Sequence, residues 1–466
     1  MTATDPQRDA DAAPATSDVV PFRDAVKAWF AISLQTFGGP AGQIAVMQRH
    51  LVDERRWIGQ RRFLHALNYC MLLPGPEAQQ LAIYVGWLLN GLRGGLVAGT
   101  LFVLPGVVAL LALSAVYVGF GDTKVVTALF AGLAPAVVAI VAQAVWRVAG
   151  RALNNRVLVG FAVLAFVALA VFGVPFPIVI AVAAVAGWAL HRWRPELVST
   201  GGGHGTAADG PQPLISDDVL HHEQPSGRRA LIILGVGLLA WFVPVALVAV
   251  TTGADSVYTQ QGLFFSGTAV VTFGGAYAVL AFVAQRAVEH YGWLSAGDMV
   301  RGLALAETTP GPLIMVVQFV AFLGAYHHPG PLDPWTAGIV ASLLTTWVTF
   351  VPCFLFILLG APYVERLRGN HALSAALTGI TAAIVGVIAN LGLYFAGHTL
   401  FRTTGTVTTG PLHLQIPELD TVRPVPVVIA LIAAVLIFKV KWSVLRVLGI
   451  CAVLGLIAGL AGLPGV

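Results

Sequence analysis

The chain has 466 residues, of which 57% are hydrophobic and only 10% are charged, and its mean hydropathy is +0.82. A soluble domain carries about 25% charged residues, so this composition excludes a water-soluble globular protein and predicts an all-α polytopic membrane protein. The formal net charge of +4 is too small for a nucleic-acid-binding face and reflects lysines and arginines in loops. Cys70, Cys353 and Cys451 are scattered through apolar segments, which argues against disulfides and against a cysteine metal site.

The predicted elements follow in chain order. Residues 1–21 are acidic and lack an apolar core, so we expect a disordered tail and no cleavable signal peptide. Apolar runs, most near the ~20 residues of a membrane span, predict helical elements at 24–47, 63–90, 93–119, 124–148, 157–173 and 176–193. The polar stretch 194–228 predicts a cytoplasmic linker, and 229–254 predicts a connecting transmembrane helix. Six further apolar runs lie at 260–285, 299–326, 334–361, 371–398, 424–440 and 442–463.

Three landmarks occur twice in the sequence. Thr36-Phe37-Gly38-Gly39, Trp57 and Pro74-Gly75-Pro76 each recur 236 residues later, as Thr272-Phe273-Gly274-Gly275, Trp293 and Pro310-Gly311-Pro312. Independent insertions would have destroyed this spacing, so residues 22–193 and 255–466 are predicted to be two copies of one unit. One helix between two copies of six elements inverts the second copy relative to the first, a plan that recurs in secondary transporters.

The Gly and Pro landmarks place helix breakers inside apolar segments. Glycine frees the backbone from helical dihedrals, and proline suits the first turn of a new helix, so we expect four half-helix N-termini near the middle of the membrane. The unpaired N–H groups and partial positive charge of such termini bind anions. The candidate substrate-binding residues are the breakers and the hydroxyls and amides beside them: Thr36, Gly38, Gly39, Pro74, Gly75, Gln79, Gln80, Thr272, Gly274, Gly275, Thr308, Thr309 and Gly311. The alternative is that the breakers only kink helices for packing.

Two carboxylates lie inside apolar segments, next to the Pro-Gly-Pro breaks. An ionisable group inside a membrane is costly and is therefore a candidate for function, so Glu77 and Glu307 could each bind a coupling proton. Glu77 could instead complement the positive end of a helix, and Glu307 could instead pair with an arginine. Leu313 and Met71 occupy the matching positions of the other copy, so any coupling role is asymmetric.

Four basic residues stand at matching ends of elements in the two copies: Arg49, His65, Arg286 and Arg301. They could attract an anion toward the site, or they could anchor the chain at the membrane surface.

Loop charges test the orientation of the chain in the membrane. With the N-terminus in the cytoplasm, most loop arginines and lysines fall on the cytoplasmic side, as the positive-inside rule requires. The exception is 48–62, which carries five arginines between the first two elements. If 24–47 and 63–90 are re-entrant hairpins, this stretch returns to the cytoplasm. If they are broken but fully spanning helices, it lies outside.

The sequence contains no signature of an ATPase or of a hydrolase. A Gly-Lys-Ser/Thr motif, a His-Glu-x-x-His motif and a Gly-x-Ser-x-Gly elbow are all absent. The histidines of the linker and loops lack partners at ligand spacing, so neither a metal nor a cofactor is expected.

Long motifs surround the breaks, namely TFGGPAGQIAVMQRHLVDERRWIGQRRF, LLPGPEAQQLAIYVGWLLNGLRGG and FVLPG in the first half, and TFGGAYAVL and LALAETTPGPLIMVVQFVAFLGAY in the second. In these motifs the chain resembles the chromate ion transporter (CHR) family, in its long, two-domain form. The resemblance implies a plasma-membrane transporter that exports chromate, is linked to the proton motive force and confers chromate resistance. It also implies sulfate as a competitor of similar shape.

The expected partners are therefore chromate or sulfate, protons as the coupling ion, membrane lipids, and a second copy of the chain in a homodimer. A sulfate or other oxyanion importer, a passive anion channel, and a membrane-embedded enzyme acting on a lipid phosphate are the alternatives. An enzyme would need paired catalytic groups, whereas the carboxylates of the apolar segments are single and far apart, so we expect no enzyme.

Overall fold

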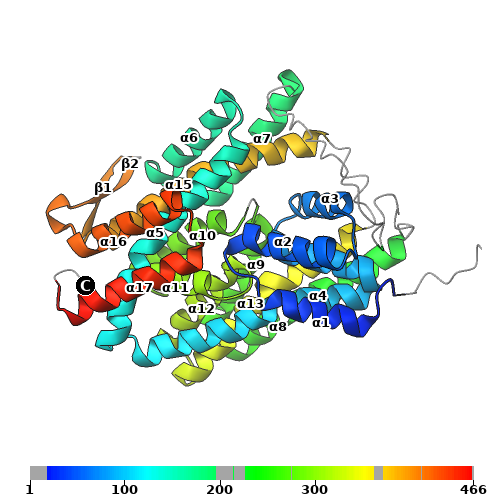
Figure 1. Cartoon of the computed structure of the whole chain (residues 1–466), viewed down its shortest axis with the longest axis horizontal. Helices are drawn as coiled ribbons and strands as arrows, with labels where there is room; N and C mark the ends of the chain where they lie inside the picture. The colour runs from blue at the N-terminus through cyan, green and yellow to red at the C-terminus, as the bar shows by residue number, and fades with distance from the viewer. Residues whose placement is uncertain are drawn as a thin grey trace, which may run out of the picture.

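The computed structural model describes residues 18–195, 214, 226–273, 275–361, 371–410 and 412–463. Within these residues the chain is almost entirely helical, with one two-stranded hairpin (Figure 1). Six of the described helices are long and apolar enough to cross a membrane, which confirms the predicted polytopic, all-α class. Most of the predicted tail, 1–21, and of the predicted linker, 194–228, lies outside the described residues, as does Gly274.

The first copy begins with broken helices and continues with long ones. Its elements are α1 (Phe22–Ser33), α2 (Gly39–Gln48), the π-helix η1 (Arg49–Glu54), α3 (Gln60–Cys70), α4 (Glu77–Phe120), α5 (Lys124–Ala152), α6 (Arg156–Ala170) and α7 (Phe176–Trp193). The predicted run 24–47 is split into α1 and α2, with Pro40 in the first turn of α2. The run 63–90 is split between α3 and α4. α4 also absorbs the predicted run 93–119, through a kink at which Gly91 leaves helical dihedrals.

The second copy repeats this pattern after the connecting helix. The elements are α8 (Gly227–Thr252), α9 (Val257–Val271), α10 (Ala276–Gln285), the π-helix η3 (Arg286–His290), α11 (Ala296–Thr308), the 3-10 turn η4 (Leu313–Met315), α12 (Val316–His327), α13 (Pro334–Gly360), α15 (His371–Leu400), α16 (Pro424–Ala434), the π-helix η7 (Val435–Lys439) and α17 (Val444–Leu460). The runs 260–285 and 299–326 are interrupted between α9 and α10 and between α11 and η4. Each of the four expected helix breaks is therefore present.

A hairpin that hydropathy did not predict lies between α15 and α16. Its strands, β1 (Thr404–Thr409) and β2 (Leu412–Pro417), pair antiparallel and are followed by the 3-10 turn η6 (Leu419–Thr421). These two strands, of which β1 is rich in threonine, lack the long apolar run that marks a membrane helix. Hydropathy alone therefore predicts a loop for this region. The hairpin contacts the first copy, because the His413 N–H donates to the Val171 carbonyl at 2.8 Å.

The two copies share local details beyond their breaks. η1 and η3 occupy matching positions, and each ends in the same backbone hydrogen bond. The Trp57 N–H donates to the Leu51 carbonyl, and the Trp293 N–H donates to the Ala287 carbonyl, both at 2.8 Å. These matches keep the offset of the sequence landmarks and support a duplication.

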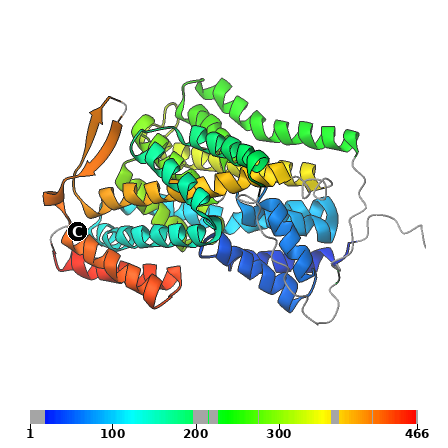
Figure 2. The same cartoon turned by 90° about the horizontal axis from the view of Figure 1, so that it is seen from above.

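Hydrogen bonds identify the segments that lie at each end of the molecule. At one end, called here the N-terminal end, the Val19 N–H donates to the Leu89 carbonyl at 3.0 Å, and the Leu214 N–H donates to the Arg56 carbonyl at 3.1 Å. At the other, the hairpin end, the Gln415 amide of β2 donates to Glu289 at 2.9 Å. In Figures 1 and 2, α1, α2 and α3 lie together at the end opposite the hairpin.

The broken helices return to the end from which they start. The Tyr258 hydroxyl, at the start of α9, donates to the Pro329 carbonyl, just after α12, at 2.7 Å. Glu289, between α10 and α11, lies at the same hairpin end. α9 with α10, and α11 with α12, therefore run inward and back. In the first copy, the bond between Val19 and Leu89 places the start of α1 beside the kink of α4.

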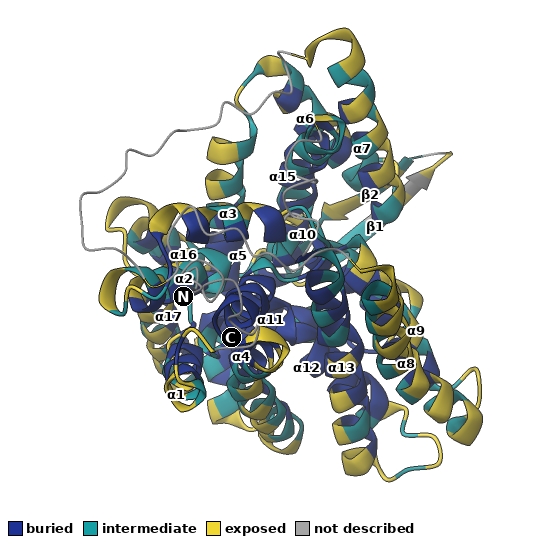
Figure 3. Ribbon diagram, turned by 90° about the vertical axis from the view of Figure 1, so that its right-hand side faces the viewer, coloured by how far each residue is buried: buried dark blue, intermediate teal, exposed yellow. Residues whose placement is uncertain are grey.

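The buried core occupies the space between the two copies. One large apolar cluster joins α4, α5 and most helices of the second copy, and a smaller cluster joins α1 to α4 with α13. α8 contributes little to them, because only Trp241 and Val245 of this helix are buried and both belong to the large cluster (Figure 3). An apolar helix with so little protein contact suits a position against lipid.

Candidate anion-binding site

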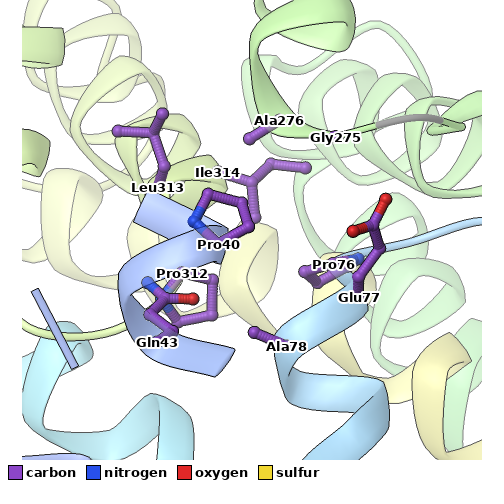
Figure 4. A pocket seen from close by; sticks show the side chains of 10 residues that line it. All are labelled: Pro40, Gln43, Pro76, Glu77, Ala78, Gly275, Ala276, Pro312, Leu313 and Ile314. Atoms are coloured by element: carbon purple, nitrogen blue, oxygen red, sulfur yellow. The ribbon is translucent and has the colours of Figure 1, made fainter. Parts of the chain in front are cut away.

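The helix starts created by the four breaks meet around one pocket. It is lined by residues of the first turns of α2, α4 and α10 and of η4: Pro40, Gln43, Pro76, Glu77, Ala78, Gly275, Ala276, Pro312, Leu313 and Ile314 (Figure 4). The volume open to the centre of a water molecule is about 10 Å³, which is about the room that one water needs. In this conformation the pocket offers less space than an oxyanion occupies.

The breaks of the two copies bind each other reciprocally. The Gly75 N–H donates to the Thr272 carbonyl at 2.7 Å, and at matching positions the Gly311 N–H donates to the Thr36 carbonyl at 3.0 Å. The first break of each copy is thus paired with the second break of the other. The side-chain amide of Gln43 adds a bond to the Gly311 carbonyl at 2.5 Å.

Two glycines at the breaks have backbone conformations that favour glycine for different reasons. Gly38 caps α2 with φ 79° and ψ 30°, a left-handed helical conformation. Gly275 caps α10 with φ 105° and ψ 164°, a region that is essentially restricted to glycine. A Cβ atom at either position would meet nothing within 4 Å. Backbone conformation, and not lack of space, therefore favours glycine at Gly38 and requires it at Gly275.

The first turns of α2, α4 and α10 present backbone N–H groups that have no acceptor within their own helix. The positive ends of these helix dipoles are directed toward the same pocket, each equivalent to roughly half an elementary charge. Such an arrangement attracts an anion without a cationic side chain in the lining.

The predicted threonines are engaged with their own helices. Each donates its hydroxyl to a backbone carbonyl within four residues, at 2.7–3.0 Å: Thr36, Thr272, Thr308 and Thr309. Their hydroxyl protons are already used in this conformation, so a contact with an anion requires a change of rotamer.

Two predicted glutamines in the first turn of α4 are fully buried. The Gln80 amide donates to the Pro74 carbonyl at 2.7 Å and so braces the break. Gln79 is 0% exposed, and within the described part of the chain neither its nitrogen nor its oxygen has a hydrogen-bond partner. Leaving a buried polar group unpaired costs about 1–3 kcal/mol, so Gln79 is a polar group that the closed conformation leaves unsatisfied.

Both candidate carboxylates lie in this region. Glu77 lines the pocket, and its carboxyl group extends toward the start of α10 (Figure 4). Glu307, in the last turn of α11, is 3% exposed and accepts a hydrogen bond from the Tyr277 hydroxyl. Tyr277 directly follows Ala276 of the lining, so it links Glu307 to the pocket. A tyrosine inside an apolar run gives no signal in the sequence, which is why this link was not predicted.

Arg49, His65 and Arg286 do not belong to the pocket lining. Arg49 donates to the Gln35 side chain at 2.7 Å, which ties the end of α2 to the first break. The Arg286 guanidinium lies over the ring of Tyr291, 5.9 Å from its centre. None of the three is among the residues that line the pocket.

Arg301 belongs to a polar cluster at the hairpin end. It lies 3.7 Å from Asp298 and donates to the Tyr117 hydroxyl at 2.9 Å. Tyr117 in turn donates to Asp298 at 2.5 Å. This cluster joins α4 of the first copy to α11 of the second, away from the pocket.

An apolar helical protein whose broken helices present their starts to one closed pocket has the architecture of a membrane transport protein. The profile of the chromate transporter family matches residues 23–188 and again residues 259–456, and the chain therefore belongs to the chromate transporter family. The two matches begin at the offset of the sequence landmarks, and they confirm the resemblance found in the motifs.

Three relatives cover most of the chain. It is 28% identical over 387 residues to the chromate transport protein of Cupriavidus metallidurans, covering 83% of this chain and 85% of that protein. It is 32% identical over 396 residues to the chromate transport protein of Pseudomonas aeruginosa, covering 82% of this chain and 83% of that protein. It is 26% identical over 410 residues to a probable chromate transport protein of Synechococcus elongatus, covering 86% of this chain and 92% of that protein. No solved structure matches the chain. The relatives are named as transport proteins, in agreement with the prediction that the chain is not an enzyme.

Proposed function

We propose that this chain transports a tetrahedral oxyanion across the plasma membrane and that chromate is its substrate. The observation that carries the proposal is the convergence of helix starts from all four breaks on one pocket. The partial charges of the α2, α4 and α10 starts, roughly +1.5 in sum, suit a dianion. The relatives named as chromate transport proteins support chromate as that dianion. Sulfate, which has nearly the same shape and charge, is the expected competitor.

The closed pocket must open toward each side of the membrane in turn. The bonds that tie Gly75 to Thr272 and Gly311 to Thr36 cross from one copy to the other beside the pocket. Separating the copies at one of these bonds would open the pocket to one side, and separating them at the other would open it to the opposite side. Gln79, unsatisfied in the closed conformation, would gain a partner when an anion enters.

Glu77 and Glu307 are the proposed coupling residues. Proton binding to either carboxylate removes negative charge beside the pocket and so strengthens anion binding. By linkage, anion binding strengthens proton binding to the same extent. The inside-negative membrane potential adds an outward force on a dianion, about 2.3 kcal/mol per charge for each 100 mV. The electrical component of the proton motive force therefore acts on export.

In the proposed topology the N-terminal end faces the cytoplasm and the broken helices are re-entrant hairpins. The bond between Leu214 and Arg56 supports this choice, since it places the arginine-rich stretch 48–62 beside a residue of the cytoplasmic linker. The five arginines then obey the positive-inside rule.

Cysteine labelling tests this topology at matched positions. Asp53 and Glu289 are both exposed, and the three native cysteines are buried, so their background labelling should be low. In whole cells we expect an impermeant maleimide to label Glu289→Cys and not Asp53→Cys. Labelling of both from the outside would reject the re-entrant arrangement.

Flux assays with purified protein in vesicles test the function itself. We expect chromate uptake into inverted vesicles to exceed that of protein-free vesicles, to be inhibited by sulfate, and to change when an imposed pH gradient is collapsed. Unchanged flux after that collapse would contradict proton coupling and favour a passive channel. Absence of flux for both chromate and sulfate would contradict the proposed function.

A further inference from the structure

The pocket is bounded on two sides by junctions between the copies. On one side the start of α2 meets the start of η4, with Gln43 and Pro312 in the lining. On the other side the start of α4 meets the start of α10, with Glu77 and Gly275 in the lining (Figure 4). Because the pocket is smaller than an oxyanion, a junction must loosen before an anion can pass through.

The junction on the Gln43 side combines backbone and side-chain bonds. The Gly311 N–H donates to the carbonyl and hydroxyl oxygens of Thr36 at 3.0 and 3.2 Å, and the Gly311 carbonyl accepts the Gln43 amide at 2.5 Å. The other junction has the backbone bond of Gly75. Val279 stands there at the position that matches Gln43, and its side chain has no hydrogen-bonding group. The Gln43 amide therefore fastens one junction and has no counterpart at the matching position of the other.

Gln43 also supplies the only side-chain amide in the described lining. Apart from Glu77, the other lining residues are proline, glycine, alanine, leucine and isoleucine. Gln43 is 1% exposed, so its amide cannot turn to bulk water and needs a partner in the protein or in the pocket. With the pocket empty, that partner is Gly311. A hydrogen bond to an anion is roughly twice as strong as one to a neutral carbonyl, so an anion in the pocket competes for the same donor.

We propose that Gln43 is the anion-binding and release residue of the pocket: its amide donates to Gly311 when the pocket is empty and to an oxyanion when the pocket is filled. This assignment rests on the proposed transport of oxyanions. The exchange of partners removes a bond from the junction between α2 and η4 and leaves the bond of Gly75 in place. A filled pocket therefore opens preferentially between α2 and η4.

A binding experiment in detergent tests the first part of the proposal. Gln43→Met removes the amide and nearly keeps the size of the side chain. Gln261→Met is the matched control, because Gln261 is 0% exposed, donates its amide to the Ala321 carbonyl at 3.3 Å and lies outside the lining. Both variants should lower the unfolding temperature. The sulfate concentration that gives half of the ligand's stabilising effect should rise roughly tenfold or more in Gln43→Met and stay unchanged in Gln261→Met. The KM for sulfate flux in vesicles should change in parallel.

Hydrogen exchange tests which junction loosens, and in the wild type it needs no substitution. Proline has no N–H, so each Pro-Gly-Pro segment has a single exchangeable amide, that of Gly75 or that of Gly311. Saturating sulfate should speed exchange at Gly311 roughly two- to tenfold and should not speed it at Gly75. In Gln43→Met, exchange at Gly311 should already be fast without sulfate.

An unchanged sulfate affinity in Gln43→Met, an equal loss in Gln261→Met, or exchange at Gly311 that sulfate does not speed would overturn the assignment. If Gln43→Met does not fold, Gln43→Leu replaces it, and the wild-type exchange result still decides. A wild type that binds sulfate but transports neither sulfate nor chromate would refute the proposed function, and the binding and exchange results would still judge Gln43. A wild type that transports, with a Gln43→Met variant of equal affinity, would refute the Gln43 assignment alone.

Discussion

The glycine that caps α10 allows a prediction whose magnitude comes from the backbone alone. Gly275 has φ 105° and ψ 164°, where any other residue costs roughly 1–3 kcal/mol. Gly38 has φ 79° and ψ 30°, where an alanine costs roughly 1–2 kcal/mol and an asparagine less. A new Cβ meets nothing within 4 Å at either position, so no steric term adds to these values.

We therefore expect Gly275→Ala to lower the free energy of unfolding by about 1–3 kcal/mol and to reduce chromate flux, because relief of the strain moves the start of α10 away from the pocket. Gly38→Asn should retain most of the stability and most of the chromate flux of the wild type. Gly253 provides a matched control, since it caps α8 with φ 98° and ψ 155°, has open space around its Cβ position and lies outside the pocket lining. Gly253→Ala should lose similar stability and keep its flux.

The assay pairs the apparent unfolding temperature in detergent with chromate flux per amount of folded protein in vesicles. The stability losses should appear as shifts of a few degrees, on the order expected for a change of this size. The reasoning is refuted if Gly275→Ala matches the wild type in both measurements. It is also refuted if Gly253→Ala loses as much flux as Gly275→Ala, because the effect would then not be specific to the pocket.

Three further predictions follow from single contacts. Gly106→Val should cost about 1–3 kcal/mol and impair flux, because a Cβ there would come within 2.5 Å of a carbonyl oxygen in the second Pro-Gly-Pro break; unfolding temperature and flux check this. Tyr277→Phe removes the hydroxyl that binds Glu307. This change should displace the pH profile of transport, with little change in the flux at the optimal pH. An unchanged pH profile would mean that Glu307 takes no part in proton coupling. Hydrogen bonds from the side chain and backbone of Thr336 hold the pKa of Asp333 below its usual 3.8. The Asp333 carboxylate therefore stabilises the fold above pH 3.8, and this stabilisation is lost as the pH falls through the folded pKa. The difference in unfolding temperature between wild type and Asp333→Asn should vanish at that low pH, and a constant difference would contradict the reasoning.

The helix breaks could be predicted because they depend on local chemistry. Gly38 and Pro40 dictate an ended helix and a new start wherever they occur in an apolar run, and the constant spacing of the landmarks identified the second copy. The threonine-rich hairpin was missed because hydropathy reports only apolar spans. Arg301 stays a candidate, and its partner Asp298 lies three residues away on the same helix, a spacing that favours an ion pair.

Other parts of the site could not be read from the sequence, because they depend on contacts between distant segments. Gln43 reaches a carbonyl 268 residues away, and Tyr277 reaches a carboxylate 30 residues away across a break. Periodicity reports which residues share a helix face, and it does not report which helices meet.

The reciprocal bonds between the breaks mean that neither copy completes the pocket by itself. A shorter polypeptide with a single copy would have to pair with a partner, and in a homodimer one sequence would have to serve both halves. Joining the copies in one chain removes that constraint and fixes their ratio at one to one. Each half is then free to specialise, and this chain has done so, since Glu77 is found in only one half and Glu307 in only the other. Fusion has thus converted a symmetric scaffold into one whose two sides can evolve separate duties.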